Sequence, residues 1–174
     1  MFRKITFALL ALTLLLAACA PAVVATPAAV EIPATEAPSL FPATPETENI
    51  SLTDGLGRQV ILAQPAQKVV SLAPSNTEIL FAIGAGGQTV GRDLFSDYPA
   101  EAQSLPDIGG SMGEYNLEAI VALQPDLVLA AEINPSELVK SLEDLGLTVF
   151  YLKNPTTLEE MYANLETVAQ LTGR

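Results

Sequence analysis

The sequence predicts an α/β fold in which a parallel sheet carries helices on both faces and is preceded by a small β-hairpin. Strand-like and helix-like segments alternate four times along residues 50–174, as in sheets wound by right-handed crossovers. The strand-like segments are short and apolar throughout, which is typical of parallel strands buried on both faces. A folded part of this length suits a single domain.

The first β-α-β unit begins with residues 68–72, whose β-branched and apolar side chains predict a buried strand. Ser75 and Glu78 have the spacing of a capping box, so a helix is expected to begin at Ser75. The helix is expected to end at Gly84, because glycine readily adopts the left-handed conformation found after helices. The next segments are a strand at 88–92 and a polar loop with two aromatic residues at 93–99.

Three more helices, each with a recognisable start, are expected after this loop. Asn116 is a good N-cap for a helix whose apolar residues share one face. Asn134 and Pro135 are expected to open the next helix, with proline at its first position. A second capping box at Thr157 and Glu160 opens the last helix. The apolar strands between these helices are expected at 127–131 and 147–152.

A hairpin is expected ahead of the main sheet. Residues 49–53 and 58–62 have strand character and flank the segment Asp54-Gly-Leu-Gly57. The glycines of that segment permit the positive φ angles that a tight turn needs. We expect the hairpin to cover one edge of the sheet.

Residues 1–18 are typical of a targeting segment and not of a fold. Arg3 and Lys4 precede an apolar run that is shorter than the roughly 20 residues of a membrane-spanning helix. Cys19, the only cysteine, follows Leu-Ala-Ala, and this pattern resembles the lipobox of bacterial lipoproteins. The resemblance implies that the leader is removed and that Cys19 carries the lipid anchor. The alternatives are an ordinary secretory peptide or a buried structural cysteine.

Residues 19–49 are rich in proline, alanine and threonine. Such a segment buries too little apolar surface to offset its chain entropy, so we expect a disordered linker. Fully extended at ~3.1 Å per residue, it could span about 90 Å. We interpret it as a tether, although an unstructured tail without a role would have nearly the same composition.

The charge and residue content argue against several function classes. The formal net charge of −12 repels phosphate backbones, so nucleic acid is not an expected partner. The chain has no histidine, which removes the usual base for a serine or cysteine nucleophile. It also has no cluster of imidazole or thiolate groups for a metal. We therefore expect neither an enzyme, nor a resident cofactor, nor a metal site.

Three stretches in a fixed order carry a resemblance to one family: SLAPSNTEILFAIGAGGQTVG at 71–91, SDYP at 96–99, and YNLEAIVALQPDLVLA at 115–130. They resemble the amino-terminal lobe of bacterial periplasmic binding proteins that serve ABC importers of iron–siderophore complexes and cobalamin. The resemblance covers residues 50–174 and implies a protein of two α/β lobes joined by a long helix. Because Arg174 lies about where that helix would begin, we expect the amino-terminal lobe without the carboxyl-terminal one.

The resemblance implies a ligand surface at the carboxyl ends of the strands, where open α/β sheets bind ligands. In the family, the turn that corresponds to Ser75 and Asn76 lines the ligand cleft, and positions matching Phe95 and Met112 face the ligand. Tyr98 shares the loop of Phe95 and has no evident core partner. The candidate ligand-binding residues are Ser75, Asn76, Phe95, Tyr98, Met112 and Tyr115. Helix capping and cover for the end of the sheet remain the alternative roles.

Glu118 lies in the first turn of a predicted helix, where the helix dipole alone favours an acid. By resemblance it matches a glutamate that pairs with arginines of the permease. The sequence therefore favours a substrate-binding lipoprotein of the cell envelope, at the outer face of the plasma membrane or in the periplasm. Its expected partners are permease subunits, a small metal-chelate ligand and the membrane. The alternative is a tethered α/β module that binds a protein and no small molecule.

Overall fold

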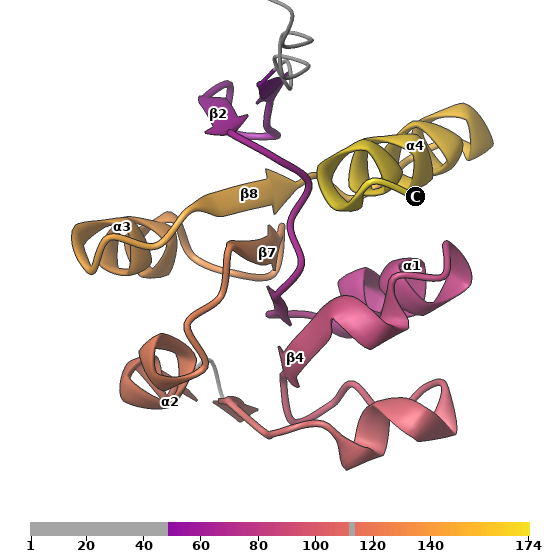
Figure 1. Cartoon of the computed structure of the whole chain (residues 1–174). Coiled ribbons are helices and arrows are strands. Elements are labelled where there is room, and N and C mark those ends of the chain that lie inside the picture. The colour runs from indigo at the N-terminus through magenta and orange to yellow at the C-terminus, as the bar shows by residue number, and fades with distance from the viewer. Residues whose placement is uncertain (1–48, 112–113) are drawn as a thin grey trace, which may run out of the picture. The chain divides into compact units, whose positions relative to one another are not determined.

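The structure is a computed structural model that describes residues 49–111 and 114–174 (Figure 1). The predicted leader, Cys19, Met112 and all of the linker except Asn49 lie outside the described residues. The division into leader, linker and lobe therefore stays a prediction. The α/β class is confirmed, since four parallel strands alternate with helices.

The main sheet has the strand order β4-β3-β7-β8, with every neighbouring pair parallel. Val69 of β3 lies opposite Leu127 of β7, and Val128 lies opposite Val149 of β8, which sets the register. The strands are β3 (Val69–Ser71), β4 (Thr89–Arg92), β7 (Leu127–Ala131) and β8 (Val149–Leu152). The helices are α1 (Pro74–Ala82), α2 (Leu117–Ala122), α3 (Ser136–Asp144) and α4 (Leu158–Thr172).

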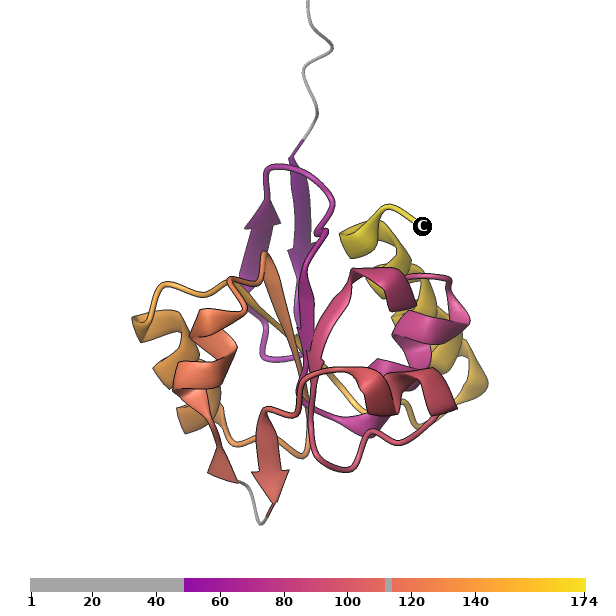
Figure 2. The same ribbon diagram turned by 60° about the horizontal axis from the view of Figure 1, so that its bottom comes forward.

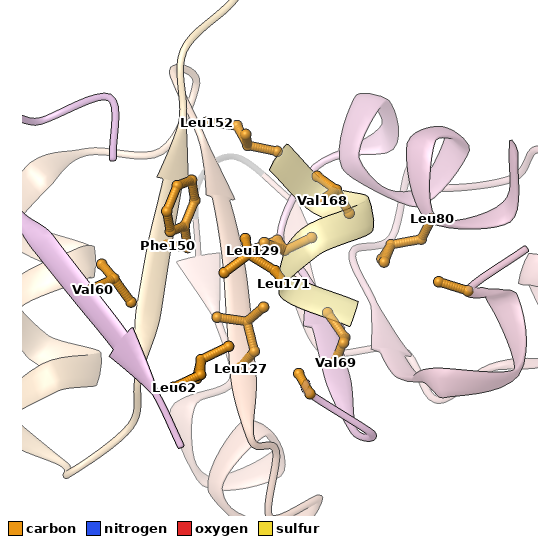
Figure 3. Close-up of a cluster of buried hydrophobic side chains, with 12 residues drawn as sticks. Val60, Leu62, Val69, Leu80, Leu127, Leu129, Phe150, Leu152, Val168 and Leu171 are labelled. Atoms are coloured by element: carbon orange, nitrogen blue, oxygen red, sulfur yellow. The ribbon is translucent and has the colours of Figure 1, made fainter. Parts of the chain in front are cut away.

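Side chains that alternate along the strands form two separate hydrophobic cores, so the prediction of helices on both faces is confirmed. On one face, Leu129 and Phe150 pack with Leu80 of α1 and Val168 of α4 (Figure 3). On the other face, strand residues such as Val128 pack with side chains of α2 and α3. Figure 2 shows α1 and α4 on the opposite side of the sheet from α2 and α3.

The predicted hairpin is present as β1 (Ile50–Thr53) and β2 (Gln59–Leu62), paired antiparallel. Its turn lies against the edge strand β8: the Gly55 amide donates to the Tyr151 carbonyl at 2.7 Å, and Asp54 accepts from the Tyr151 amide at 3.3 Å. The hairpin thus covers one edge of the sheet, as predicted. A Cβ at Gly55 would meet the Tyr151 carbonyl oxygen at 3.0 Å, so this close approach favours glycine.

Four small elements that no sequence pattern predicted complete the fold. A short antiparallel pair brackets residues 112–113, and two 3-10 turns follow α1 and the loop at 93–99. They are β5 (Gly109–Ser111), β6 (Glu114–Tyr115), η1 (Gly86–Gln88) and η2 (Ala100–Ser104).

Two predicted helix starts are wrong. Helix α1 begins at Pro74, one residue early, and its N-cap Ala73 makes no side-chain bond, so Ser75 and Glu78 form no capping box. Helix α3 is preceded by Pro135 as N-cap, because the Asn134 oxygen is used elsewhere. Two local signals are confirmed: the Asn116 side chain accepts from the third amide after it at 2.9 Å, and Thr157 does the same at 3.2 Å.

Candidate functional site

The strand order creates a switch point between β3 and β7. The connection after β3 leads to β4 at one edge of the sheet, and the connection after β7 leads to β8 at the opposite edge. Crevices outside the carboxyl ends of such strands are where open α/β sheets bind ligands. The segments at this crevice are the β3–α1 connection with the first turn of α1, which carries Ser75 and Asn76, and the β7–α3 loop, which carries Asn134.

Two buried asparagines join the segments at the switch point. The Asn76 side-chain amide donates to the Leu129 carbonyl of β7 at 3.0 Å. The Asn134 amide donates to the Leu72 carbonyl at 3.2 Å and to the Tyr115 hydroxyl at 2.7 Å. Both asparagines are at most 2% exposed. Buried amides that hydrogen-bond across segments hold those segments in one geometry, so this crevice is preorganised.

Tyr115 joins the same hydrogen-bond network at the switch point. Its hydroxyl donates to the Leu72 carbonyl at 2.8 Å. Burial raises the pKa of Tyr115, and the nearby Asp93 carboxyl raises it as well, while the hydrogen bond from Asn134 acts in the opposite direction. The phenol therefore keeps its proton near neutral pH and remains a donor.

A pocket of about 400 Å³ lies at the carboxyl end of β8, between α1 and α4. Apolar side chains such as Ile79, Leu152 and Leu165 line it together with polar ones. This mixture is typical of small-molecule sites, in which a few polar groups orient a ligand over an apolar wall. Other lining residues are Ser75, Asn76, Glu78, Tyr98, Lys153, Asn154, Met161 and Asn164. A second pocket of about 470 Å³ adjoins it and includes Glu132 and Glu160.

Large apolar side chains at this edge of the sheet are exposed. Phe95 is 60% and Tyr98 67% exposed, and Ile133, which follows β7, is 75% exposed. The interpretation that Phe95 and Tyr98 lack a core partner agrees with these values. These exposed side chains make the carboxyl-terminal edge of the sheet a candidate interaction surface.

The structure brings three of the predicted site residues together, because Ser75, Asn76 and Tyr98 line the same pocket. Phe95 lies on the loop of Tyr98 but outside the pocket lining, and Glu118 is exposed in the first turn of α2. Asn76 has its amide nitrogen engaged by β7, so its side chain shapes the crevice.

Sequence reasoning missed the role of Asn134 and the pocket wall contributed by α4. The sequence offered a signal for Asn134 only as a helix cap, because its true partners come from β7, the β3–α1 connection and Tyr115. Met161 and Leu165 recur at helical spacing and were indistinguishable from core residues in the sequence.

No group of three or more histidine, cysteine, aspartate or glutamate side chains within 49–111 and 114–174 is arranged to hold a metal ion. Within the same ranges, no helix has both the length and the apolar character to cross a membrane.

Fold and crevice define a class: an α/β lobe that presents a preorganised surface at the carboxyl ends of parallel strands. The family model for periplasmic binding proteins matches residues 69–174. The chain therefore belongs to the periplasmic binding protein family, as the sequence motifs indicated.

Relatives with known names share this family. The chain is 33% identical over 127 residues to an uncharacterized ABC transporter substrate-binding lipoprotein of Bacillus subtilis (strain 168), a match covering 71% of this chain and 40% of that protein. It is 39% identical over 109 residues to the vitamin B12-binding protein of Yersinia pestis (strain Pestoides F), covering 62% and 38%. The chain spans less than half the length of these relatives.

Solved structures of periplasmic binding proteins resemble the fold of this chain. The periplasmic vitamin B12 binding protein of Vibrio cholerae superposes with a TM-score of 0.57 at 35% identity, over 62% of this chain and 42% of that one. A periplasmic heme binding protein from Pseudomonas aeruginosa superposes with a TM-score of 0.57 at 30% identity, over 62% and 39%. All four names describe solute binding and none an enzyme, in agreement with the sequence-based expectation.

Proposed function

We propose that this chain provides a ligand-binding lobe of the substrate-binding component of an ABC importer, and that its ligand is a metal macrocycle of the cobalamin or heme type. The observation that carries the proposal is the exposed aromatic pair Phe95 and Tyr98, which lies on the loop after the carboxyl end of β4. Aromatic rings gain both apolar burial and stacking energy against a flat ligand. Relatives named for vitamin B12 and heme binding support the same ligand class.

The proposed ligand surface combines that aromatic pair with the pocket beside it. Ser75 and Tyr98 line the pocket, and Tyr115 supports the crevice from below through Leu72. Met112 belongs to the same proposed surface by its place in the family motif. High affinity needs burial of most of a ligand's surface. A pocket of about 400 Å³ covers only part of a macrocycle, so we expect weak binding by this chain alone.

Titration of the purified chain with cyanocobalamin, hemin and a ferric siderophore tests the proposal, and absorbance changes of each ligand report binding. We expect saturable one-to-one binding of a macrocycle, with a Kd in the range of about 1 µM to 1 mM. The siderophore represents the other ligand class that the sequence predicts. Phe95→Ala with Tyr98→Ala should weaken binding about tenfold or more.

The matched control is Tyr162→Ala, which removes an aromatic side chain that is 58% exposed and lines neither pocket. It should leave the Kd unchanged. Absence of saturable binding for all three ligands would refute the proposal and favour the alternative, a tethered module that binds a protein. An equal loss of affinity in the control would show that the aromatic pair is not the site.

Permease docking and membrane anchoring complete the proposal. Glu118 is exposed in the first turn of α2, a position open to a basic partner surface. Cys19 follows a lipobox-like pattern, and the Bacillus subtilis relative is named a lipoprotein. Together they support a place in the cell envelope, with permease subunits and the membrane as proposed partners.

A further inference from the structure

Four buried polar side chains form a continuous hydrogen-bonded chain beneath the aromatic loop, which we define as residues 93–99. The Ser96 hydroxyl donates to the Asp93 carboxyl. The Thr77 hydroxyl oxygen lies 2.8 Å from that of Ser96 and also 2.8 Å from that of Ser71, so it links the two serines. All four residues are at most 2% exposed. The chain joins the aromatic loop to α1 through Thr77 and to β3 through Ser71.

Asp93 is held by hydrogen bonds and not by an ion pair. Among the described residues, no lysine or arginine side chain forms a salt bridge with it. The other carboxyl oxygen of Asp93 accepts from the Phe95 amide at 2.9 Å. The Arg92 guanidinium does not bond the carboxyl group and donates to the backbone carbonyls of Asp93 and Leu94 at 2.8 and 3.1 Å. Burying a carboxyl group is unfavourable unless its hydrogen bonds are made. Each bond that satisfies Asp93 also fixes the backbone of the aromatic loop.

The buried hydrogen-bonded side chains connect the two halves of the candidate ligand surface. On one side, the aromatic loop carries the exposed Phe95 and Tyr98. On the other side, Thr77 directly follows Ser75 and Asn76 in the first turns of α1. A polar network whose members are all satisfied rigidifies the elements that it joins. The two halves therefore hold one relative geometry before any ligand arrives.

We propose that Asp93, Ser96 and Thr77 are positioning residues that orient Phe95 and Tyr98 relative to Ser75 for the ligand. This inference rests on the proposed function, because it concerns the same surface. Preorganised groups bind more tightly, since less ordering has to take place on binding. None of the three residues is exposed enough to contact a ligand itself, so their effect passes through the aromatic loop.

Hydrogen–deuterium exchange of residues 93–99 tests the positioning role without any ligand. Ser96→Ala and Thr77→Val each remove one hydroxyl group, and amide exchange in the aromatic loop should become about tenfold faster or more. The matched control is Thr172→Val. Thr172 is 2% exposed and donates to Val168 within α4, so its loss should lower global stability without a selective effect on the loop.

Asp93 offers a rescue experiment. Asp93→Ala removes both acceptors and should release the loop. Asp93→Asn keeps one oxygen for the Phe95 amide and presents an N–H group to Ser96, so loop protection should be retained. Unchanged loop exchange in Ser96→Ala, Thr77→Val and Asp93→Ala would overturn the inference.

Cyanocobalamin titration of the same variants connects the loop to binding. Ser96→Ala should raise the Kd about tenfold, and Asp93→Asn and Thr172→Val should leave it near the wild-type value. Faster amide exchange in the aromatic loop together with an unchanged Kd for cyanocobalamin would overturn the positioning role. If the wild-type chain binds neither cyanocobalamin nor hemin, the proposed function fails, and the exchange result alone then decides whether the buried chain positions the loop.

Discussion

At the scale of single residues, Asn134 connects more segments than its position in the sequence indicates. Its oxygen accepts from the Ala131 amide at 2.7 Å, while its amide group donates to Leu72 and Tyr115. Asn134→Ala leaves these buried groups unpaired, and we expect a loss of about 1–3 kcal/mol in the free energy of unfolding. Urea denaturation measures it. Asn154→Ala, at an exposed asparagine, should change stability by less than about 0.5 kcal/mol.

Asp54 gives the stability of the chain a defined pH dependence. Burial alone would raise the pKa of Asp54, but the hydrogen bonds and charge of Arg58 outweigh it and lower the pKa below its ordinary value. The folded state therefore binds this proton less readily than the unfolded chain. The stabilisation is complete above the unfolded pKa of about 4 and is lost as the pH falls through the lower, folded value.

Asp54→Asn should therefore lower the free energy of unfolding at pH 7 by about 1.5–3 kcal/mol and flatten its decline below pH 4. Denaturation curves measured from pH 7 downward follow both effects. The control is Asp144→Asn, which removes the exposed Lys140–Asp144 pair and should change stability by less than about 1 kcal/mol. A steep acid decline that survives in Asp54→Asn would assign the pH dependence to other carboxyl groups.

At the scale of helices and strands, local signals predicted an element well when its partners are also local. Asn116 and Thr157 cap their helices as expected, because each accepts from an amide three residues away. Ser75 and Asn134 have equally good capping chemistry, but α1 already begins at Pro74 and Asn134 bonds across the sheet. Tertiary contacts therefore decided the cases in which the sequence pattern failed.

The candidate site was predictable to a similar degree. Exposure of Phe95 and Tyr98 followed from their place on a polar loop after a strand. The pocket itself did not, because it forms only when α4 packs beside α1, and no local pattern specifies that pair. Strand order was also inaccessible, since parallel neighbours are set by packing between segments far apart in the sequence.

Helix α2 carries a prediction that separates docking from helix stability. Glu118 in α2 and Glu137 in α3 are both exposed acids in a first helical turn, so both interact similarly with a helix dipole. Glu118→Lys and Glu137→Lys should therefore lower the melting temperature by similar small amounts. Only Glu118→Lys should weaken binding to the cognate permease, by about tenfold, in a pull-down titration. Equal binding by the two variants would remove Glu118 from the docking surface.

At the scale of the whole molecule, the proposed function places the lobe beside a permease in a membrane. The chain has a formal net charge of −12, and residues 19–49 are rich in proline and alanine. In the proposed function, an acidic lobe on the predicted tether searches for a basic docking surface within reach of its anchor, and complementary charge would raise the encounter rate. Anchoring also raises the effective concentration of the lobe at the permease. The proposed mechanism therefore depends on the lipid at Cys19.

Cys19→Ser tests that dependence in cells that express the full chain. The wild-type protein should partition into the detergent phase of a Triton X-114 extract, because an acylated lipoprotein cysteine carries more than one acyl chain. More than one chain is what stable anchoring takes. Cys19→Ser removes the sulfur that would be acylated, so the protein should move to the aqueous phase. Ala20→Ser, a change at the neighbouring residue, is the control and should partition like the wild type. An ordinary secretory leader predicts the opposite result: wild-type protein in the aqueous phase and no effect of Cys19→Ser.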